Sequence, residues 1–310
     1  MACFLITGDW HITDKRPENR IDDYAESCFR KLRFIFDTVR KNNVSTILQP
    51  GDFTDSPFMS YTLLIRLINF LNEYSDIDIF TCYGQHDLRF RTKENCVLSA
   101  IVAACKNVHL PEQITGFLAG FEKNIYVYGS SYNEDVPELI SEQGFNVLVI
   151  HKMIIQDKLW EGQTECTPSL NFLRANKFDL ICSGDNHQGF ISDSKVLKKQ
   201  LFNCGSLLRA KTDQINHQPF IVLYDTDTRE YEKILIPIEP AENVFSLEKV
   251  VKEKEKNENL ASFVTGLSES KEIGLKFEDN LNAYLNDNDI GHEIREIIDW
   301  AKIGNKDDRQ

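Results

Sequence analysis

The first turn of the chain is Gly8-Asp9-Trp10-His11, which directly follows an apolar run over residues 2–6. A short apolar run that ends at a glycine predicts a buried strand rather than a helix. Residues two apart in extended backbone point to the same side, so Asp9 and His11 can hold one metal ion at the end of this strand. The alternative for a lone D-x-H tripeptide is a solvated loop, and the rest of the sequence decides between the two.

Strand-like and helix-like segments alternate after this turn. Apolar residues recur at three- and four-residue steps over 22–41 and 59–74, which predicts two amphipathic helices. The short apolar runs 46–48 and 77–83 predict strands. Such alternation is typical of a mostly parallel sheet covered by helices. Further expected elements are a helix near 94–104, a hairpin from 114–121 and 125–128, strands at 147–150 and 178–182, and a strand pair from 220–224 and 233–238.

The bulk composition is that of a globular protein. The 310 residues are 42% hydrophobic, and no apolar run approaches the roughly 20 residues that span a bilayer. The eight cysteines form no C-x-x-C pair, as expected in a reducing compartment. We therefore expect a cytoplasmic protein without membrane association, in the host cytoplasm if a phage encodes it. The net charge of −13 argues against a sequence-blind nucleic-acid coat, although bound divalent metals can reverse the local sign.

The composition changes near residue 239. Residues 239–310 contain 17 acidic and 10 basic residues, and the signs alternate over 252–258, as on a solvated helix. We expect one main domain over 1–238 and an acidic, largely helical appendage over 239–310.

Five strand-like runs each end in a turn that carries metal-ligand residue types. Ligands of open α/β sheets bind beyond the carboxyl ends of the strands, so these turns are expected to meet in one place. The alternative is that all five are polar caps on strand ends, and the recurrence of the same residue types in order argues against it. The residues in these turns are Asp9 with His11, Asp52, Gln85 with His86 and Asp87, His151, and Asp185 with His187.

This order of motifs resembles that of the calcineurin-like metallophosphoesterase superfamily, whose pattern is D-x-H, G-D, G-N-H-[DE], a lone His and G-H-x-H. The resemblance covers about residues 1–210. Within the superfamily the chain looks most like the SbcD branch, the nuclease subunit of a DNA double-strand-break repair complex, in its shorter, phage-like form. The resemblance implies a four-layer α/β/β/α sandwich with a small C-terminal appendage. The narrower match rests on Asp9-Trp10-His11, Pro50-Gly51-Asp52-Phe53-Thr54-Asp55-Ser56 and Asn203-Cys204-Gly205-Ser206.

The resemblance also implies a centre of two divalent metal ions. Two such ions polarise phosphoryl oxygens and generate hydroxide at neutral pH, and a bridging carboxylate holds them close together. Carried over residue by residue, the first ion would be held by Asp9, His11 and His187, Asp52 would bridge to the second, and Gln85, His151 and Asp185 would complete the second site.

Other residues in and near the third motif receive roles from the same resemblance or from their position. His86 would protonate the leaving oxygen or steady the phosphate, with Asp87 orienting it. Arg89 and Arg91 flank Phe90 directly after this motif, so the loop can bind the phosphate backbone of DNA. The alternative for this loop is a solvated turn.

Two positions depart from the family pattern, and both belong to the second metal site. Gln85 stands where the family has Asn, and Asp185 stands where it has the first His of G-H-x-H. Gln85 keeps an amide oxygen and adds one methylene, and Asp185 replaces a nitrogen ligand by a carboxylate oxygen. The site becomes richer in oxygen and more negative, which favours Mn²⁺, or Mg²⁺, over zinc. The alternative is a degraded second site and a mainly structural role.

The expected function is therefore that of a DNA exonuclease and endonuclease in repair, recombination or replication, working with an SbcC-like ATPase. One alternative is a metallophosphoesterase for a small phosphodiester or a phosphoprotein, and another is a non-catalytic scaffold of the ATPase complex. The sequence also leaves open whether the chain forms a homodimer. A predicted helix in the appendage provides a candidate docking face for the ATPase, unless that face packs on its own domain. Its residues are Ile290, Ile294, Ile297, Ile298 and Ala301.

Overall fold

The computed structural model divides the chain into two compact units, Met1–Phe245 and Ser246–Gln310. Helix α5 (Ala241–Val244) belongs to the first unit. The domain boundary expected at residue 239 stays a prediction, and the predicted docking face at 290–301 lies outside the described residues. The structure describes residues 3–90, 92–111, 115–116, 124–159, 163–211, 214–246, 248–249, 251, 281, 285 and 295.

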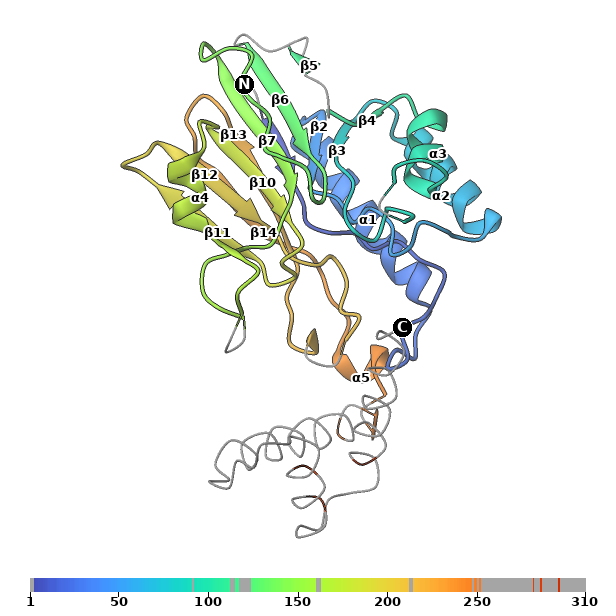
Figure 1. Cartoon of the computed structure of the whole chain (residues 1–310). Helices are drawn as coiled ribbons and strands as arrows, with labels where there is room; N and C mark the ends of the chain where they lie inside the picture. The colour runs from blue at the N-terminus through green and yellow to red at the C-terminus, as the bar shows by residue number, and fades with distance from the viewer. Residues whose placement is uncertain are drawn as a thin grey trace, which may run out of the picture. The chain divides into compact units, whose positions relative to one another are not determined.

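The first unit contains two six-stranded sheets (Figure 1). The first sheet has the order β14-β13-β1-β2-β3-β4, in which β1 to β4 are parallel and β13 and β14 are antiparallel additions. Strand β13 pairs with β1 on the side away from β2, so β1 lies inside the sheet. The strands are β1 (Cys3–Ile6), β2 (Thr46–Gln49), β3 (Asp78–Thr81), β4 (Val108–His109), β13 (Phe220–Asp225) and β14 (Tyr231–Leu235).

The second sheet has the order β11-β12-β10-β7-β6-β5, with a parallel centre formed by β12, β10, β7 and β6. Strand β5 pairs antiparallel with β6, as the predicted hairpin requires. The strands are β5 (Thr115–Gly116), β6 (Ile125–Ser130), β7 (Phe145–His151), β10 (Leu180–Gly184), β11 (Phe190–Ser194) and β12 (Lys199–Asn203), and a separate small pair is formed by β8 (Ile154–Ile155) and β9 (Thr167–Pro168).

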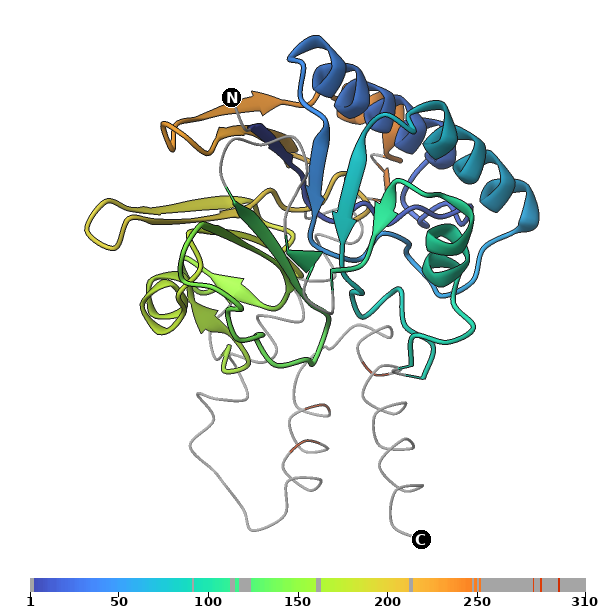
Figure 2. The same ribbon diagram turned by 90° about the horizontal axis from the view of Figure 1, so that it is seen from above.

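Helices cover the outer face of each sheet (Figure 2). Helices α1 (Tyr24–Lys41), α2 (Tyr61–Glu73) and α3 (Val97–Ala104) pack on the first sheet, and α4 (Ser169–Ala175) packs on the second. Asp23 caps α1 by accepting from the Glu26 N–H, and Ser60 caps α2 by accepting from the Leu63 N–H. These caps explain why the helices begin at residues 24 and 61 rather than 22 and 59.

Three apolar cores separate the four layers. Phe4 and Ile6 of β1 belong to the core between the sheets, whereas Leu5 belongs to the core under α1, α2 and α3, because successive strand residues point to opposite faces. A third core lies between the second sheet and α4. The expected four-layer α/β/β/α sandwich is confirmed.

The remaining sequence expectations concern cysteines and membranes. The seven cysteines from Cys28 to Cys204 are all free, and six of them are buried. None of the helices in the described part of the chain is long and apolar enough to cross a bilayer.

The core under the helices gives a first prediction. Phe36 of α1 is fully buried, with its ring centroid 5.2 Å from that of Phe70 and 4.7 Å from that of Tyr74. Phe36→Ala would leave a cavity there, so we expect the free energy of unfolding, measured by chemical denaturation, to fall by about 3–5 kcal/mol. Lys41→Ala, at an exposed position on the same helix, should change it by less than about 0.5 kcal/mol. Equal losses in the two variants would contradict the packing described.

Candidate metal centre

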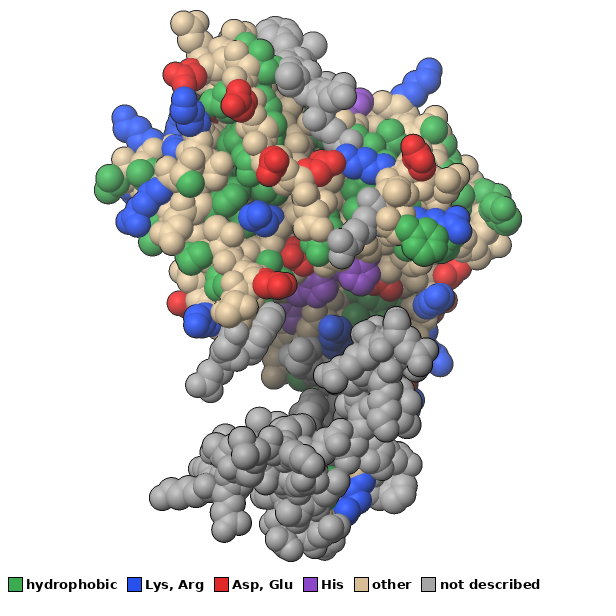
Figure 3. All heavy atoms as spheres, viewed as in Figure 1, with side chains coloured by type: hydrophobic (Ala, Val, Ile, Leu, Met, Phe, Trp, Pro, Cys, Tyr) green, Lys and Arg blue, Asp and Glu red, His purple; other side chains and the backbone are tan. Residues whose placement is uncertain are grey.

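All seven predicted metal ligands lie at the carboxyl ends of parallel strands. Asp9 and His11 follow β1, Asp52 follows β2, and Gln85 follows β3 in the first sheet. In the second sheet His151 ends β7, while Asp185 and His187 follow β10. The two sheets face each other, so these strand ends meet, and histidine side chains gather on one face of the molecule there (Figure 3). The convergence predicted from the motif order is present.

The turns that carry the ligands adopt uncommon backbone conformations. His11, Asp52 and Asp185 have φ values of 47°, 46° and 75°, a region that costs energy for residues with a Cβ and often occurs at functional sites. Gly84 is required by close approach, because a Cβ there would lie 2.0 Å from the Asp52 Oδ1 atom. The fold therefore accepts local strain to place these side chains.

Four ligand atoms form a first buried cluster. Those of Asp9, His11, Asp52 and His187 all lie within 4.8 Å of one another. The Nε2 atoms of His11 and His187 are 3.0 Å apart. The His11 Nε2 atom is 3.6 Å from Asp52 Oδ2, and the His187 Nε2 atom is 3.7 Å from Asp9 Oδ2. These four atoms are thus close enough together to bind one metal ion.

A second group adjoins the first at Asp52. The His151 Nε2 atom lies 3.4 Å from Asp52 Oδ2 and 2.7 Å from Gln85 Oε1. The His151 Nδ1 atom donates to the Pro50 carbonyl at 2.7 Å, which leaves Nε2 as the ligand atom. The Gln85 amide donates from Nε2 to Asp185 Oδ1 at 2.9 Å, so its Oε1 atom faces His151. Asp52 Oδ2 is therefore shared between the two groups, the position of a bridging ligand.

Unpartnered oxygen atoms test whether this site fits metal ions. Asp9 Oδ1 and Asp52 Oδ2 are buried and accept no hydrogen bond from the described residues. Buried carboxylate oxygens without donors are costly unless a cation neutralises them. The ligand set therefore fits two divalent metal ions: Asp9, His11, Asp52 and His187 around the first, and Asp52, Gln85, His151 and Asp185 around the second.

The pKa values of the centre also indicate a site for cations. Burial raises the pKa of Asp9 to about 8, although His151 opposes the rise. Burial acts against the charge of Asp52 too, but His151 and His11 outweigh it and lower the pKa of that carboxyl. Burial alone would lower the pKa of His151, yet Asp52 and Asp9 raise it to about 10. Burial and the neighbouring His11 lower the pKa of His187 to about 3. At neutral pH without metal, Asp9 and His151 thus hold protons where cations would bind, whereas Asp52 and His187 are unprotonated.

His86 lies beside the first cluster with its side chain 41% exposed. Its backbone N–H donates to Asp52 Oδ1 at 2.9 Å, and its ring centroid is 4.8 Å from that of His11. Its Nδ1 atom lies 3.1 Å from the Asp55 carbonyl oxygen, which can only accept, so Nδ1 carries the proton. The prediction that Asp87 orients His86 is wrong, because Asp55 does so.

Asp87 instead ties two loops together. This fully buried carboxylate accepts hydrogen bonds from the N–H groups of Phe53, Thr54 and Gly84 and from the Thr54 hydroxyl. Burial and the nearby Asp52 raise its pKa to about 6. Asp87 thus positions the β2 and β3 turns that carry ligands, without a described contact to the His86 ring.

Asp55 is a site residue that the motif pattern did not assign. Besides the contact of its carbonyl with His86, its Oδ1 atom lies 3.2 Å from His11 Nδ1. The only sequence signal is its place three residues after Asp52 in the run Pro50 to Ser56. Asp55 orients both the ligand His11 and the candidate acid His86.

Arg89, three residues after His86, lies in a cluster of exposed aromatic rings. Its guanidinium carbon is 4.9 Å from the Phe58 ring centroid and 5.3 Å from that of Phe90. Phe58 is 56% exposed and Phe90 is 86% exposed. Backbone hydrogen bonds in both directions between Arg89 and Thr92 close the turn that displays Phe90. The other predicted contact, Arg91, lies outside the described residues.

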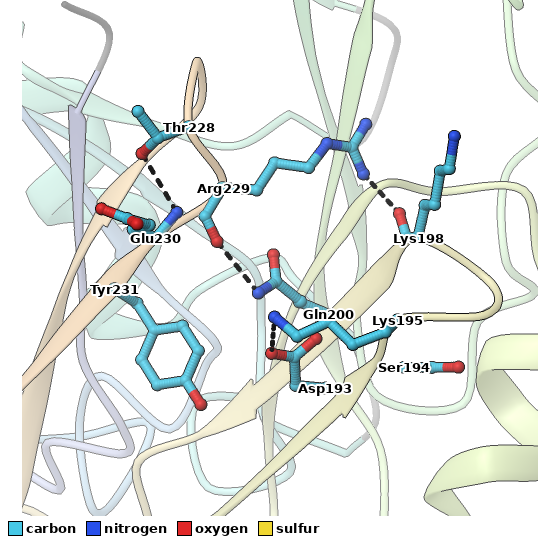
Figure 4. Close-up of a pocket in the computed structure, with 9 residues that line it drawn as sticks. All are labelled: Asp193, Ser194, Lys195, Lys198, Gln200, Thr228, Arg229, Glu230 and Tyr231. Atoms are coloured by element: carbon cyan, nitrogen blue, oxygen red, sulfur yellow. Dashed lines mark hydrogen bonds and ion pairs between the residues drawn. The ribbon is translucent and has the colours of Figure 1, made fainter.

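A cavity of about 340 Å³ opens beside the second group. Another cavity, of about 640 Å³, lies between the β11–β12 and β13–β14 hairpins (Figure 4). It contains Gln200 near the start of β12, and β12 runs parallel to β10, so it lies at the end of the sandwich opposite the ligands. The 340 Å³ cavity, in contrast, adjoins the metal centre. Its lining residues are Tyr132, Asn133, Glu134, His151, Lys152, Met153, Glu165, Cys166, Thr167 and Asp185.

Comparison with protein families identifies this arrangement. Residues 4–189 match the family model for calcineurin-like phosphoesterases. The chain is a calcineurin-like phosphoesterase. The matched segment contains every ligand of the phosphoesterase centre described above.

Solved structures similar to this phosphoesterase share little sequence with it. A protein of Thermus thermophilus has 11% identity and a TM-score of 0.48, with 76% of this chain and 99% of that chain covered. A dimetal phosphatase from Danio rerio has 12% identity, a TM-score of 0.48 and coverage of 76% and 99%. A novel archaeal phosphodiesterase has 13% identity, a TM-score of 0.40 and coverage of 75% and 99%. A search of the curated proteins returned no match.

The raised pKa values predict how metal binding depends on pH. Metal ions and protons compete for Asp9, whose metal-free pKa is about 8, and for His151, whose metal-free pKa is about 10. Affinity for Mn²⁺ should therefore fall as the pH drops below 8, by about tenfold or more per pH unit. Calorimetric titration of the metal-free chain between pH 6 and 8.5 measures this, with two equivalents bound at the upper end. A single equivalent, or an affinity independent of pH, would contradict the assignment.

The four hydrogen bonds to Asp87 give a further prediction. Asp87→Asn would place an amide N–H₂ group among N–H donors, leaving at least one of them unpaired. We expect the free energy of unfolding to fall by about 1–3 kcal/mol and phosphodiester hydrolysis to fall with it, because the β2 and β3 turns lose their tie. Asp37→Asn, at an exposed position on α1, is the control. An unchanged melting temperature in Asp87→Asn would refute this role.

Proposed function

We propose that this phosphoesterase is a metal-dependent DNA nuclease of the SbcD type, with exonuclease and endonuclease activity. The observation that carries the proposal is that two candidate binding features accompany the metal centre. One is the 340 Å³ cavity lined by His151 and Asp185, and the other is the exposed cluster of Phe58, Arg89 and Phe90, of which Arg89 and Phe90 follow His86 within four residues. A polymer substrate uses such additional contacts, whereas a small phosphodiester does not need them.

The aromatic cluster suits nucleic acid for physical reasons. Exposed phenyl rings stack on bases without regard to sequence, and an arginine beside them pairs with a phosphate. Phe90 is 86% exposed and lies beside Arg89, so its ring is accessible to a stacking base. Substrate phosphates are attracted to this region by Arg89 and by the bound cations, which offset the net charge of −13.

The chemistry divides between the ions and the protein. When bound, two divalent ions polarise the phosphoryl group and supply a hydroxide nucleophile. Asp52 holds the two positions together, and Asp55 keeps the Nδ1 proton of His86 in place. With Nδ1–H engaged by the Asp55 carbonyl, His86 would give the leaving oxygen a proton carried on its Nε2 atom. We propose Mn²⁺ as the physiological ion, or Mg²⁺, because Gln85 and Asp185 make the second position rich in oxygen.

The biological setting of the proposal follows from the SbcD resemblance. An SbcC-like ATPase would be the partner, and DNA repair, recombination or replication in the cytoplasm would be the process. The ATPase would supply DNA-binding surface that this acidic chain provides only locally.

The decisive experiment is degradation of end-labelled linear duplex and single-stranded DNA in Mn²⁺, with and without a candidate ATPase. His86→Ala should lower cleavage by about 10²-fold or more, because the leaving oxygen loses its proton donor. His109→Ala is the matched control, since His109 pairs with Asp78 on the first sheet and contacts none of the described ligands. Hydrolysis of a nitrophenyl phosphodiester without DNA cleavage would indicate a small-substrate enzyme, and inactivity on both would indicate a scaffold.

A further inference from the structure

A small cavity lined by basic residues lies apart from the metal centre. It has a volume of about 100 Å³ and lies between α1 and the segment that leads from β14 to α5. Among its described lining residues four are basic and one, Glu239, is acidic. This balance is opposite to that of the chain, whose net charge is −13. The lining residues are Arg20, Ser27, Arg30, Lys31, Phe34, Arg209, Ile236, Pro237, Glu239 and Val244.

Two of the basic residues are deeply buried arginines. Arg20 and Arg209 are each only 4% exposed. Arg20 has a carboxylate partner, because its Nε and Nη2 atoms donate to the two oxygens of Asp22 at 2.7 Å and 2.6 Å. The described hydrogen bonds of Arg209 go to the carbonyl oxygens of Ile215 and Glu239. Arg209 is thus a buried cation whose described acceptors are all uncharged.

Lys31 of α1 is a partly buried cation that also donates to a backbone carbonyl. Its Nζ atom donates to the Leu207 carbonyl at 2.8 Å. Burial and the nearby Arg209 and Arg20 lower the pKa of Lys31 to about 7. Burial and the nearby Arg20 also lower the pKa of Arg209, and Asp22 and Glu239 offset this only in part. Cations brought together out of water at this cost are stabilised most directly by an anion between them.

We propose that this cavity binds one tetrahedral oxyanion, such as a phosphate group. The donors that remain on Lys31 and on the two guanidinium groups match the acceptor oxygens of such a group. The cavity is smaller than the roughly 300 Å³ at which pockets begin to admit drug-sized ligands, so it suits a single phosphate group. Free phosphate and a phosphate of a nucleic-acid strand share this chemistry.

The position of the cavity links it to the metal centre through one residue. The Leu207 carbonyl accepts from Lys31, and the Leu207 N–H donates to the Asp9 carbonyl at 2.8 Å. Asp9 is a metal ligand in the arrangement described above. The oxyanion site is nevertheless distinct from that centre and does not depend on the nuclease proposal.

The test is binding of inorganic phosphate to the full chain in excess chelator, which removes metal ions that would themselves bind phosphate. Thermal unfolding and calorimetry should show stabilisation of the wild-type protein. Lys31→Met should weaken phosphate binding by about tenfold or more, through loss of a charge-assisted hydrogen bond. This variant is expected to fold, because Lys31 is only partly buried and Met keeps the apolar contacts of its stem. Lys41→Met, exposed on the same helix, should bind phosphate like wild type.

A second arm separates the two sources of the phosphate group. A single-stranded oligonucleotide without terminal phosphates is titrated under the same conditions into wild type and Lys31→Met. Weaker binding of both probes to the variant supports a strand phosphate as ligand, and weaker binding of inorganic phosphate alone supports a free ion. Equal phosphate binding by wild type and Lys31→Met, or no phosphate binding by either, overturns the proposal.

Discussion

Two buried carboxylates, Asp9 and Asp52, are held close together with an unpartnered oxygen on each, and the rest of the site is built around them. Such an arrangement cannot persist in a solvated loop, because the side chains would turn toward water or toward N–H donors. The parallel strands supply rigid attachment points, and the Asp87 carboxylate ties the β2 and β3 turns behind them. Positive φ angles at His11 and Asp52 are the local cost of this arrangement.

The two departures from the family pattern are physically coupled. The hydrogen bond from the Gln85 amide to Asp185 fixes which end of the amide faces His151. Without an acceptor at Asp185, the longer Gln85 side chain would have more freedom to turn its nitrogen toward the centre. The pair is therefore one compensated change at the second position, in which an amide oxygen and a carboxylate replace the family's Asn and His. This coupling argues against two independent losses of function.

The strand-end ligands could be predicted from sequence because their position depends on local alternation and on the direction of parallel strands. Asp9 and His187, for example, could be predicted as ligands from their position shortly after an apolar run. The hydrogen-bond partner of His86 could not be predicted, because adjacency in sequence favoured Asp87, whereas the turn directs Asp87 toward Thr54 and Gly84. The basic cavity could not be predicted from sequence either, because Arg20 and Arg209 come together only where the β12–β13 loop lies near the start of α1.

The place of β13 beside β1 has a consequence for how the chain is made. Strand β1 carries the first ligands at its end, yet its antiparallel partner spans Phe220–Asp225, beyond the last ligand. During translation one edge of β1 stays open until most of this unit has left the ribosome. An open apolar edge strand invites wrong pairing, so the nascent chain is vulnerable for most of its synthesis. Pairing of β13 with β1 thus ends this exposure and fixes the strand that carries Asp9 and His11 at its end.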